Sequence, residues 1–446
     1  MKRVILFLNL FLFAGIGLFS QSINLEEARN LALANSRSLA KYTMAIRGSI
    51  LDERNQLYSM LPSLSAGYSA SMGYLDKDWN FVNPIDTFST GFTFSITQII
   101  FEGGKSFVQK AIRSIATESV RKDALAEYFN VIDAVDSAYY AVLEAASNLE
   151  AAESSLQTAD LTFSIAEIRY TSGIINQGDY LKALSDRETR ENSRNQARRN
   201  LALSVAKFNA LTGLKETVVL EQIDFGVYEG LIQHLAGISD EDADALYSRF
   251  HTILVAANPS LAKAALNSQR AEKNFSLAWR DFFPTISATI FSTGLQYSKA
   301  DGFSAKGSGG ISISGSIPID FWVTSNRIEK SKIDRDSAAL DYIGAVSSME
   351  TELQAALLNT FTQAESVLSS RRSLEYAERH LEFVMERYRL SQGSVSDLQD
   401  ATSLLIAGRN NFIGASYGFL RSLSKLSSLG AIEDEEKLLL ILMGQI

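Results

Sequence analysis

The chain contains a tandem repeat, which limits its fold more than any other feature of the sequence. The segment SLAKYTMAIRGSILDERNQLYSMLPSLSA matches SLAKAALNSQRAEKNFSLAWRDFFPTISA, and RYTSGIINQGDYLKA (169–183) matches RYRLSQGSVSDLQDA (387–401). Such a match predicts two copies of one structural unit. The aligned pairs keep a constant register: Lys41 with Lys263 and Pro62 with Pro284 at an offset of 222 residues, and Tyr170 with Tyr388, Asp179 with Asp397, Ala183 with Ala401 and Lys207 with Lys425 at an offset of 218.

Each copy has the same predicted order of elements: a helix, a strand, a loop, a strand, a long helix, a turn and a helix. We expect a signal peptide at 1–20, a first repeat at 21–213 and a second repeat at 246–428. The connecting segment 214–245 and the tail 429–446 have no repeat partner, and the acidic run ISDEDADAL in the former is typical of a helix start. The predicted strands cover about 63–75, 87–100, 285–297 and 308–319, and the predicted helical hairpins cover 102–212 and 325–428.

All four predicted strands alternate apolar residues with small or polar ones, as in FSTGFTFSIT. This alternation fits a soluble strand with one buried face, which is the commoner case, and equally a membrane-barrel strand between lipid and water. Each run reaches the roughly 9–11 residues that a tilted membrane strand needs, and this length favours the barrel. The third strand changes phase between Ile290 and Leu295, which predicts a β-bulge.

The predicted long helices carry apolar residues at alternating steps of three and four, the pattern of a coiled-coil seam. A helix from Leu125 to Tyr170 would be roughly 70 Å long at 1.5 Å per residue. A coiled coil that only packs would show the same pattern. The first seam contains Leu125, Tyr128, Ile132, Val135, Tyr139, Val142, Ala146 and Leu149, then, after a three-residue step, Ala152, Leu156, Ala159, Phe163, Ala166 and Tyr170. The second contains Ile343, Val346, Leu353, Leu357, Ala364, Val367, Leu374, Ala377, Leu381, Val384 and Tyr388, interrupted by Glu350 and Thr360.

The N-terminus has the composition of a secretory signal. Lys2 and Arg3 precede the apolar run VILFLNLFLFAGIGLF, and small residues follow near Ser20. A membrane anchor is the alternative, but the run is short and no basic residues follow it directly. The chain has no cysteine, so export leads neither to disulfides nor to a lipid-anchored cysteine. The net charge of −9 argues against nucleic acid as a partner.

No later stretch is apolar enough for a transmembrane helix, so a chain of this kind that crosses a membrane must do so with its strands. Four strands cannot close a barrel, because the smallest single-chain barrels have about 8. Open strand edges are not tolerated in lipid. If the strands span a membrane, the chains must therefore associate, and three chains would supply twelve strands.

The chain resembles the TolC-type outer-membrane efflux proteins over essentially the whole mature length. The resemblance rests on the opening LEEARNLALANSRSLAK, on LPSLSA before the first strand, on IIFEGGK after the second, on the paired RY…D…A turns and on the duplication itself. It implies a mainly α fold with a transmembrane β-barrel. Three chains would share one twelve-stranded barrel in the outer membrane, and their long antiparallel coiled-coil hairpins would continue as a periplasmic tunnel.

The resemblance also implies a function and partners. The homotrimer would be a passive export duct that opens when a periplasmic adaptor (membrane fusion) protein and an inner-membrane pump or ABC transporter dock at its tip. Asp397 and Asp400 would point into the tunnel as the periplasmic constriction, although helix capping is the alternative for both. Tyr388 would bond near Asp179 on a neighbouring turn and hold the tip shut. Gly393 stands where the family has a latch arginine, so we expect one closing ion pair to be missing.

Further residues are assigned by their place in the repeat. In the first repeat, Lys182 replaces the second acid of the constriction. Simple turn chemistry is the alternative for the expected adaptor-docking residues. These are Ser172, Gly173 and Ile174 in the first tip and Leu390, Ser391 and Gln392 in the second. On the strands, we expect Tyr68, Phe92 and Phe94 to face outer-membrane lipid, and Ser69, Thr93 and Ser95 to face water.

The sequence predicts no enzyme, cofactor or metal site. His234, His251 and His380 are scattered, and FEGGK and GSGG lack the spacing of a phosphate-binding loop. One rival interpretation is a secreted, soluble coiled-coil scaffold, which would purify without detergent. Another is a periplasmic adaptor, although adaptors carry one hairpin with lipoyl-like β modules. The sequence leaves the cargo open among drugs, dyes, metal ions, peptides and proteins.

Overall fold

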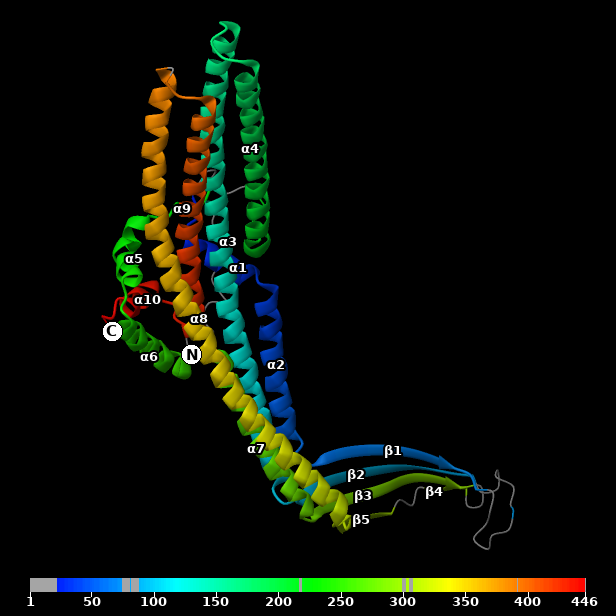
Figure 1. Ribbon diagram of the computed structural model, residues 1–446. Helices are drawn as coiled ribbons and strands as arrows, with labels where there is room; N and C mark the ends of the chain where they lie inside the picture. The colour runs from blue at the N-terminus through cyan, green and yellow to red at the C-terminus, as the bar shows by residue number, and fades with distance from the viewer. Residues whose placement is uncertain are drawn as a thin grey trace.

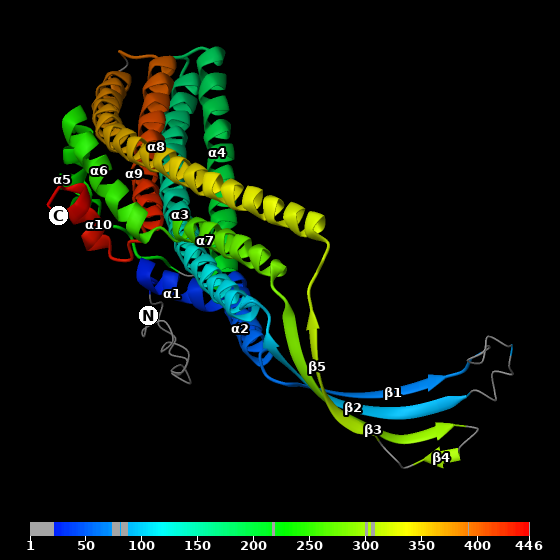
Figure 2. The ribbon, with the colours of Figure 1, turned by 90° about the horizontal axis from the view of Figure 1, so that it is seen from below.

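The computed structural model describes residues 22–73, 81, 88–215, 219–298, 302–304, 308–390 and 392–445 (Figure 1). The predicted signal peptide at 1–20 lies outside these residues. The chain forms a long helical body, and a curved sheet extends from one end of that body (Figure 2). Within the described residues, no helix combines the length and the apolar character that crossing a membrane requires.

The two repeats have the same order of elements. The first contains α1 (Leu25–Asn35), α2 (Arg37–Tyr58), β1 (Ser63–Ser71), β2 (Ser89–Phe101), α3 (Lys105–Thr171) and α4 (Gln177–Thr212). The second contains α6 (Asp240–Ala257), α7 (Pro259–Trp279), η3 (Arg280–Phe282), β3 (Thr285–Ser298), β4 (Gly302–Ser304), β5 (Gly309–Ser316), α8 (Phe321–Arg389) and α9 (Val395–Gly430). The elements η2 (Phe225–Tyr228) and α5 (Glu229–Ala236) connect the repeats, and α10 (Glu435–Leu442) follows the second.

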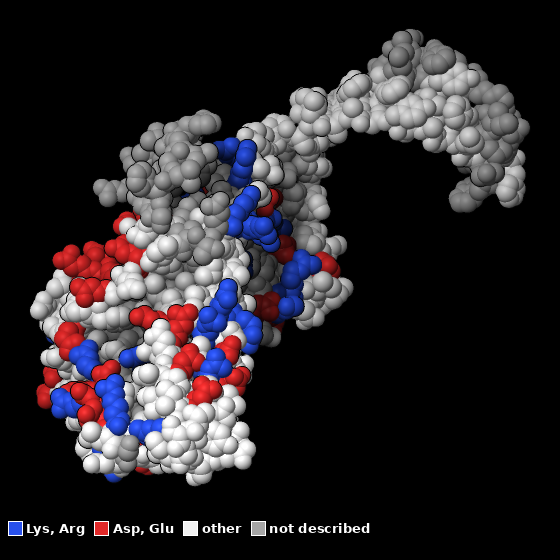
Figure 3. Space-filling view, turned by 90° about the horizontal axis from the view of Figure 1, so that it is seen from above, with Lys and Arg blue, Asp and Glu red and all other residues white. Residues whose placement is uncertain are grey.

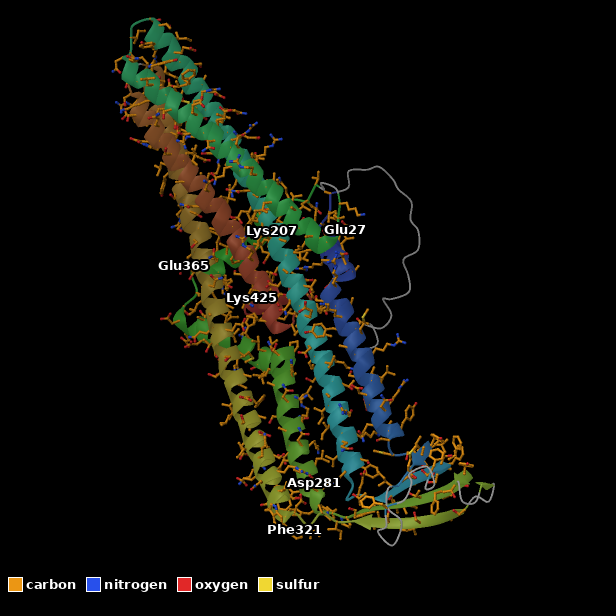
Figure 4. All side chains as sticks on the ribbon, turned by 90° about the vertical axis from the view of Figure 1, so that its right-hand side faces the viewer. Glu27, Lys207, Asp281, Phe321, Glu365 and Lys425 are labelled. Atoms are coloured by element: carbon orange, nitrogen blue, oxygen red, sulfur yellow. The ribbon has the colours of Figure 1, made fainter. Side chains whose placement is uncertain are left out.

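The duplication is visible in the lengths of the helices. The long helices α3 and α8 contain 67 and 69 residues, and their partners α4 and α9 contain 36 each. At 1.5 Å per residue, α3 and α8 are each about 100 Å long. Lys207 and Lys425, an aligned pair of the repeats, both lie near the C-terminal ends of their helices, α4 and α9 (Figure 4).

Four helices lie side by side at each level of the body, and two of the four change between the tip half and the sheet half. In the half of the body far from the sheet, the order is α8, α9, α3, α4 (Figure 1). Near the sheet, α7 and α2 take the places of α9 and α4, so the order is α8, α7, α3, α2. The chain therefore has α8 along one lateral edge and α4 and α2 along the other.

The seam between the helices differs in part from the predicted one. In α8 the predicted residues Leu353, Leu357, Ala364 and Val367 are buried, but Ile343 is 62% exposed. In α3 the predicted Ala146 is exposed, and Leu156 and Phe163 are only partly buried. The side chains that α3 buries in the seam are mostly small, and small side chains permit close approach of neighbouring helices. The larger Leu156 and Phe163 therefore lie at the flanks of the seam. The buried row of α3 contains Ala151, Ser155, Ala159, Thr162 and Ala166.

The sheet is antiparallel and open. The strand order is β1–β2–β3, and both β4 and β5 pair with the remaining side of β3. Because β4 pairs with residues 296–298 and β5 with residues 285–292, they are successive parts of one fourth strand position. The predicted bulge is confirmed, since Phe92 alone stands opposite Gly294 and Leu295. The last strand ends at Ser316 rather than near 319, because Pro318 has no N–H for the ladder.

The main core lies at mid-height, where the shorter helices pack on the long ones. Phe250 and Leu254 of α6, Leu353 of α8, and Phe419 and Leu426 of α9 are fully buried in one cluster. The helices α5 and α10 complete this layer, which we call the belt. The acidic run of the connecting segment starts α6 as predicted, with the Ser239 side chain accepting a hydrogen bond from the Asp242 N–H.

Polar contacts link the helices to one another at the level of the belt. Asp136 of α3 is 1% exposed, and its carboxylate accepts two hydrogen bonds from Arg29 at 2.7 and 2.6 Å and one from Ser424 at 2.8 Å. These bonds tie α1, α3 and α9 together and offset the cost of a buried charge. Glu350, the acid on the predicted seam of α8, lies 3.1 Å from His251 Nε2 of α6. Glu350 is tolerated on the predicted seam because His251 of the belt helix α6 is its polar partner.

Candidate functional site

The second tip turn begins α9 with a capping box. The Ser394 side chain accepts a hydrogen bond from the Asp397 N–H at 3.1 Å, and the Asp397 carboxylate accepts one from the Ser394 N–H at 3.0 Å. The hydrogen bond from the Ser394 backbone holds the pKa of the Asp397 carboxyl below its usual value, and the Ser394 hydroxyl and the nearby Arg387 act in the same direction. In the single chain, Asp397 is thus a capping residue.

Asp397 and Asp400 share one exposed face of α9, as their spacing predicts. The opposite face of this first turn carries Val395, Leu398 and Ala401, which are buried against the neighbouring helices. The two carboxylates are therefore presented together to whatever space this face of α9 borders. Their place in the constriction stays a prediction, because it depends on where the other chains lie.

The first tip turn is built in the same way. The Asn176 side chain accepts a hydrogen bond from the Asp179 N–H at 2.9 Å and donates one to the Asp179 carboxylate at 3.0 Å. Before it, Gly173 ends α3 with a positive φ of 72°, a conformation that favours glycine. The N–H groups of Gly173 and Ile174 bond to the carbonyls of Tyr170 and Arg169. Turn chemistry thus accounts for the backbone of this tip.

The expected docking residues are exposed at both tips. Ser172 ends α3 as its C-cap, and Ile174 is 67% exposed. In the second tip, Leu390 is 61% exposed, and the Gln392 N–H bonds to the Arg387 carbonyl at 2.8 Å. The third residue assigned to that turn, Ser391, lies outside the described residues. Two large apolar side chains therefore stand free at the end of the body, one on each hairpin.

Tyr388 lies inside a small buried cluster at the tips. It is 2% exposed and packs with Ala166, Ala183, Val384 and Leu398, so all four long helices contribute. Its hydroxyl makes no hydrogen bond to any described residue. Burial raises the pKa of this hydroxyl, the Arg169 charge opposes that shift, and the Asp179 charge adds to it. The hydrogen bond expected between Asp179 and Tyr388 is not formed within the chain.

Arg169 contacts Tyr388 directly. The sequence analysis placed it in the RY…D…A motif but assigned it no role. Its guanidinium carbon lies 4.5 Å from the centre of the Tyr388 ring, and its Nη2 donates a hydrogen bond to the Tyr388 carbonyl at 2.9 Å. Two signals were available: its place in the repeated RY…D…A motif, and its position in the last turn of α3, where basic residues often bind helix C-termini.

The sheet has one apolar face and one polar face. Tyr68 stands opposite Phe92 with ring centres 5.0 Å apart, and Phe94, on the same face, is 54% exposed. The other face is a ladder of hydroxyl contacts: Ser65 with Ser95 at 2.7 Å, Thr97 with Thr289 at 3.0 Å, and Ser287 with Ser314 at 3.0 Å. An apolar face of this size that stays uncovered marks a surface for lipid or for another protein.

Charged residues are absent from the four longer strands. β1, β2, β3 and β5 contain no Lys, Arg, Asp or Glu. In the view from the tip end, charged side chains of both signs lie over the helical body (Figure 3). The boundary falls at η3, where Asp281 bonds to Lys105 at 3.0 Å and to Arg327 at 2.7 Å. Exposed aromatic residues, among them Phe321 and Trp322, lie at the same junction (Figure 4).

The described part of the chain holds no group of three or more His, Cys, Asp or Glu side chains placed to bind a metal ion. The three histidines lie apart, and His251 is engaged by Glu350. The features that remain are an open two-faced sheet, two long hairpins, and a tip that carries paired acids and exposed apolar residues.

Comparison with known proteins gives the same picture. The chain is 22% identical to outer membrane protein TolC of Escherichia coli (strain K12), over 99% of this chain and 89% of TolC. The Campylobacter jejuni CmeC outer membrane channel superposes with a TM-score of 0.75 at 17% identity, over 93% of this chain and 88% of CmeC. CusC superposes with a TM-score of 0.77 at 18% identity, over 94% of this chain and 95% of CusC.

The model of the family described as "Outer membrane efflux protein" matches residues 28–214 and 253–430, one segment in each repeat. The matched segments include both hairpins, both tips and all the strands. The mainly helical fold with an open antiparallel sheet, the duplication and the outer-membrane location predicted from the sequence are thereby confirmed. The chain belongs to the outer membrane efflux protein family.

Proposed function

We propose that three copies of this chain form one channel-tunnel that carries substrates from an inner-membrane pump across the periplasm and the outer membrane. The observation that carries this proposal is the open sheet, with an exposed apolar face, a Ser/Thr face and two unpaired edges. In lipid, each unpaired N–H or C=O costs several kcal/mol, so edges β1 and β5 must find partners. Pairing β1 of one copy with β5 of the next closes a ring.

The helices support the same head-to-tail arrangement. The edge that carries β1 also carries α2, and Met44, Leu51 and Tyr58 form an exposed apolar stripe on α2 at seven-residue spacing. The edge that carries β5 continues into α8, where Ile333 and Leu340 are exposed at the same spacing. Stripes with this period are typical of coiled-coil contacts. The two edges of one copy therefore match the opposite edges of its neighbours.

The chain would act as a passive duct. Its long helices α3 and α8 are each about 100 Å long, and with their partner helices they would extend the barrel into the periplasm as a tunnel. Ser172, Gly173 and Ile174, with Leu390, Ser391 and Gln392, would receive the periplasmic adaptor, and a pump or ABC transporter would complete the assembly. The exposed Ile174 and Leu390 support a docking role, because apolar side chains gain free energy when a partner covers them.

The tip would close the duct. Asp397 and Asp400 share one exposed face, so three copies around an axis would form two acidic rings. Tyr388, which is buried among residues of both hairpins, and Asp179 would take part in holding the hairpins together. The capping role of Asp397 is compatible with an acidic ring, because the carboxylate keeps its negative charge when it accepts the hydrogen bond from the Ser394 N–H.

Mass spectrometry of the detergent-solubilised native protein should show three chains, and planar bilayers should show ion channels of one conductance class. A stable monomer in the bilayer would overturn the proposal. A secreted coiled-coil scaffold predicts instead that the mature chain purifies without detergent and forms no channels. The exposed apolar face of the sheet disfavours that scaffold.

A further inference from the structure

The contact between Arg169 and Tyr388 joins the two hairpins across 219 residues of sequence. Arg169 lies in the last turn of α3, and Tyr388 lies in the last turn of α8. The guanidinium lies over the tyrosine ring, with its carbon 4.5 Å from the ring centre, and Nη2 bonds to the tyrosine carbonyl at 2.9 Å. One side chain thus makes two contacts of different kinds with one residue.

The environment of Tyr388 favours both contacts of Arg169. Tyr388 is 2% exposed, and a cation stacked on a ring gains most where water is excluded. The Tyr388 carbonyl is among the last four of α8, which have no partner within the helix. A positive charge there also complements the negative end of the helix dipole. Arg169 therefore fixes the end of α8 as well as the ring.

Two other polar contacts between the hairpins near the tips join a different pair of helices, α4 and α9. Gln399 of α9 bonds to the Lys182 carbonyl of α4 at 3.0 Å, and Arg190 of α4 bonds to Ser403 of α9 at 3.0 Å. Gly393, the position where the family has a latch arginine, offers no side chain. A Cβ there would lie 3.3 Å from the Tyr388 nitrogen, which is tight, so the turn itself favours glycine.

We propose that Arg169 is the positioning residue that holds the tips of α3 and α8 together in the closed channel, and that its contacts with the ring and carbonyl of Tyr388 hold them. The proposal rests on the function proposed above. Arg169 supplies a side-chain hydrogen bond between the hairpins next to a turn whose Gly393 has no side chain to offer. Loss of Arg169 frees the end of α8, and the tip opens.

The test compares single-channel conductance in planar bilayers for four variants and a control. Arg169→Met removes the charge and keeps the length of the side chain, and Arg169→Lys keeps the charge without the planar group. Tyr388→Phe removes only the hydroxyl, and Tyr388→Leu removes the ring. The control is Arg187→Met, because Arg187 pairs with Asp160 inside the first hairpin at 2.7 Å and does not reach α8.

Arg169→Met and Tyr388→Leu should raise the conductance several-fold. Arg169→Lys should give a smaller rise, Tyr388→Phe should open the channel less than Tyr388→Leu, and the control should match the parent. A hydroxyl latch predicts instead that Tyr388→Phe opens the channel as fully as Tyr388→Leu, and that result would overturn the inference. So would an Arg169→Met channel with the conductance of the parent.

A second measurement is independent of conduction. The chain has no cysteine, so cysteines placed at Ile174 and Leu390 can carry spin labels without background. Arg169→Met should lengthen or broaden the distance distribution between the two tips, and Arg187→Met should not. An unchanged distribution in Arg169→Met would overturn the latch. A parent without channels would overturn the proposed function, and the distance measurement would still decide the role of Arg169.

Discussion

At the scale of single residues, Asp397 has two roles that do not conflict. Its carboxylate completes the cap of α9, and it lies on the exposed face that also carries Asp400. The cap was foreseeable, because Ser394 and Asp397 are three residues apart and capping is local. The proposed acidic ring requires three chains. It could not be predicted from the spacing of two acids in one chain.

Trivalent cations should block the parent channel from the tip side, because three copies of Asp397 and Asp400 concentrate negative charge in a narrow opening. The block should be lost in Asp397→Ala/Asp400→Ala and retained in Ser394→Ala, which removes the hydroxyl from the cap and keeps both charges. Single-channel recording with and without the cation decides the matter. Equal block in the parent and the double variant would reduce the two aspartates to caps.

The same recordings give a pH dependence. The hydrogen bond from the Ser394 backbone lowers the pKa of Asp397, so its charge persists to a pH below the usual carboxyl range. The cap's contribution to stability is present above the unfolded pKa and is lost as the pH falls through the lowered folded value. Repulsion among the like charges of three copies acts in the opposite direction and raises the carboxyl pKa values in the ring. The cation block should therefore weaken as the pH falls through the carboxyl range, and Ser394→Ala, which lacks the lowering effect of the Ser394 hydroxyl, should lose it at a higher pH than the parent.

Sequence patterns located residues whose partners are near in the chain and missed those whose partners are remote. Tyr388 was placed on the buried seam because of its helical spacing. Arg169 was assigned no role, because its partner is 219 residues away and no local pattern records the pair. The buried Asp136 escaped notice for the same reason, since Arg29 is 107 residues distant.

At the scale of elements, the strands were predictable because alternation repeats every two residues. Even the bulge in β3 was visible as a change of phase. The helical seam of α3 was harder, because its buried row contains Ser155 and Thr162 rather than the larger Leu156 and Phe163. A search for large apolar residues at coiled-coil spacing finds the flank of such a seam instead of its centre.

The two faces of the sheet should tolerate charge very differently. Phe94→Arg places a cation on the apolar face and should destabilise the inserted protein by about 2–4 kcal/mol if it lies near the middle of the bilayer. Ser95→Arg places it on the hydroxyl face, where water can solvate it, and should cost much less. Folding titrations into lipid vesicles in denaturant give both values. Equal losses at the two positions would contradict a membrane barrel.

At the scale of the whole molecule, the duplication gives the chain two lateral edges of unlike composition. The edge with α2 and β1 presents Leu51, and the edge with α8 and β5 presents Leu340. The sequence showed the repeat and the need for association. It did not show which helices form the edges, because Ile343 and its neighbours were assigned to the seam within the chain.

Leu51→Asp and Leu340→Asp should each weaken the trimer, because each places a charge in an apolar contact between copies. Val227→Asp is the matched control, since Val227 is an exposed apolar residue of η2, in the segment that connects the repeats, and belongs to none of the edge elements α2, β1, β5 and α8. Native mass spectrometry at decreasing protein concentration should show dissociation of the first two before the parent and the control. If both edge variants remain trimeric as firmly as the control, the copies meet elsewhere.

The unlike edges also have a genetic consequence. In the proposed ring every subunit pairs with both of its neighbours. A chain with a mutated β5 edge that cannot pair still joins through its normal β1 edge, and it then prevents closure of the ring. A cell that makes normal and spoiled chains in equal amounts would complete only about one ring in eight if the subunits mix at random. A lesion at a single edge should therefore be dominant, whereas loss of the whole chain should be recessive.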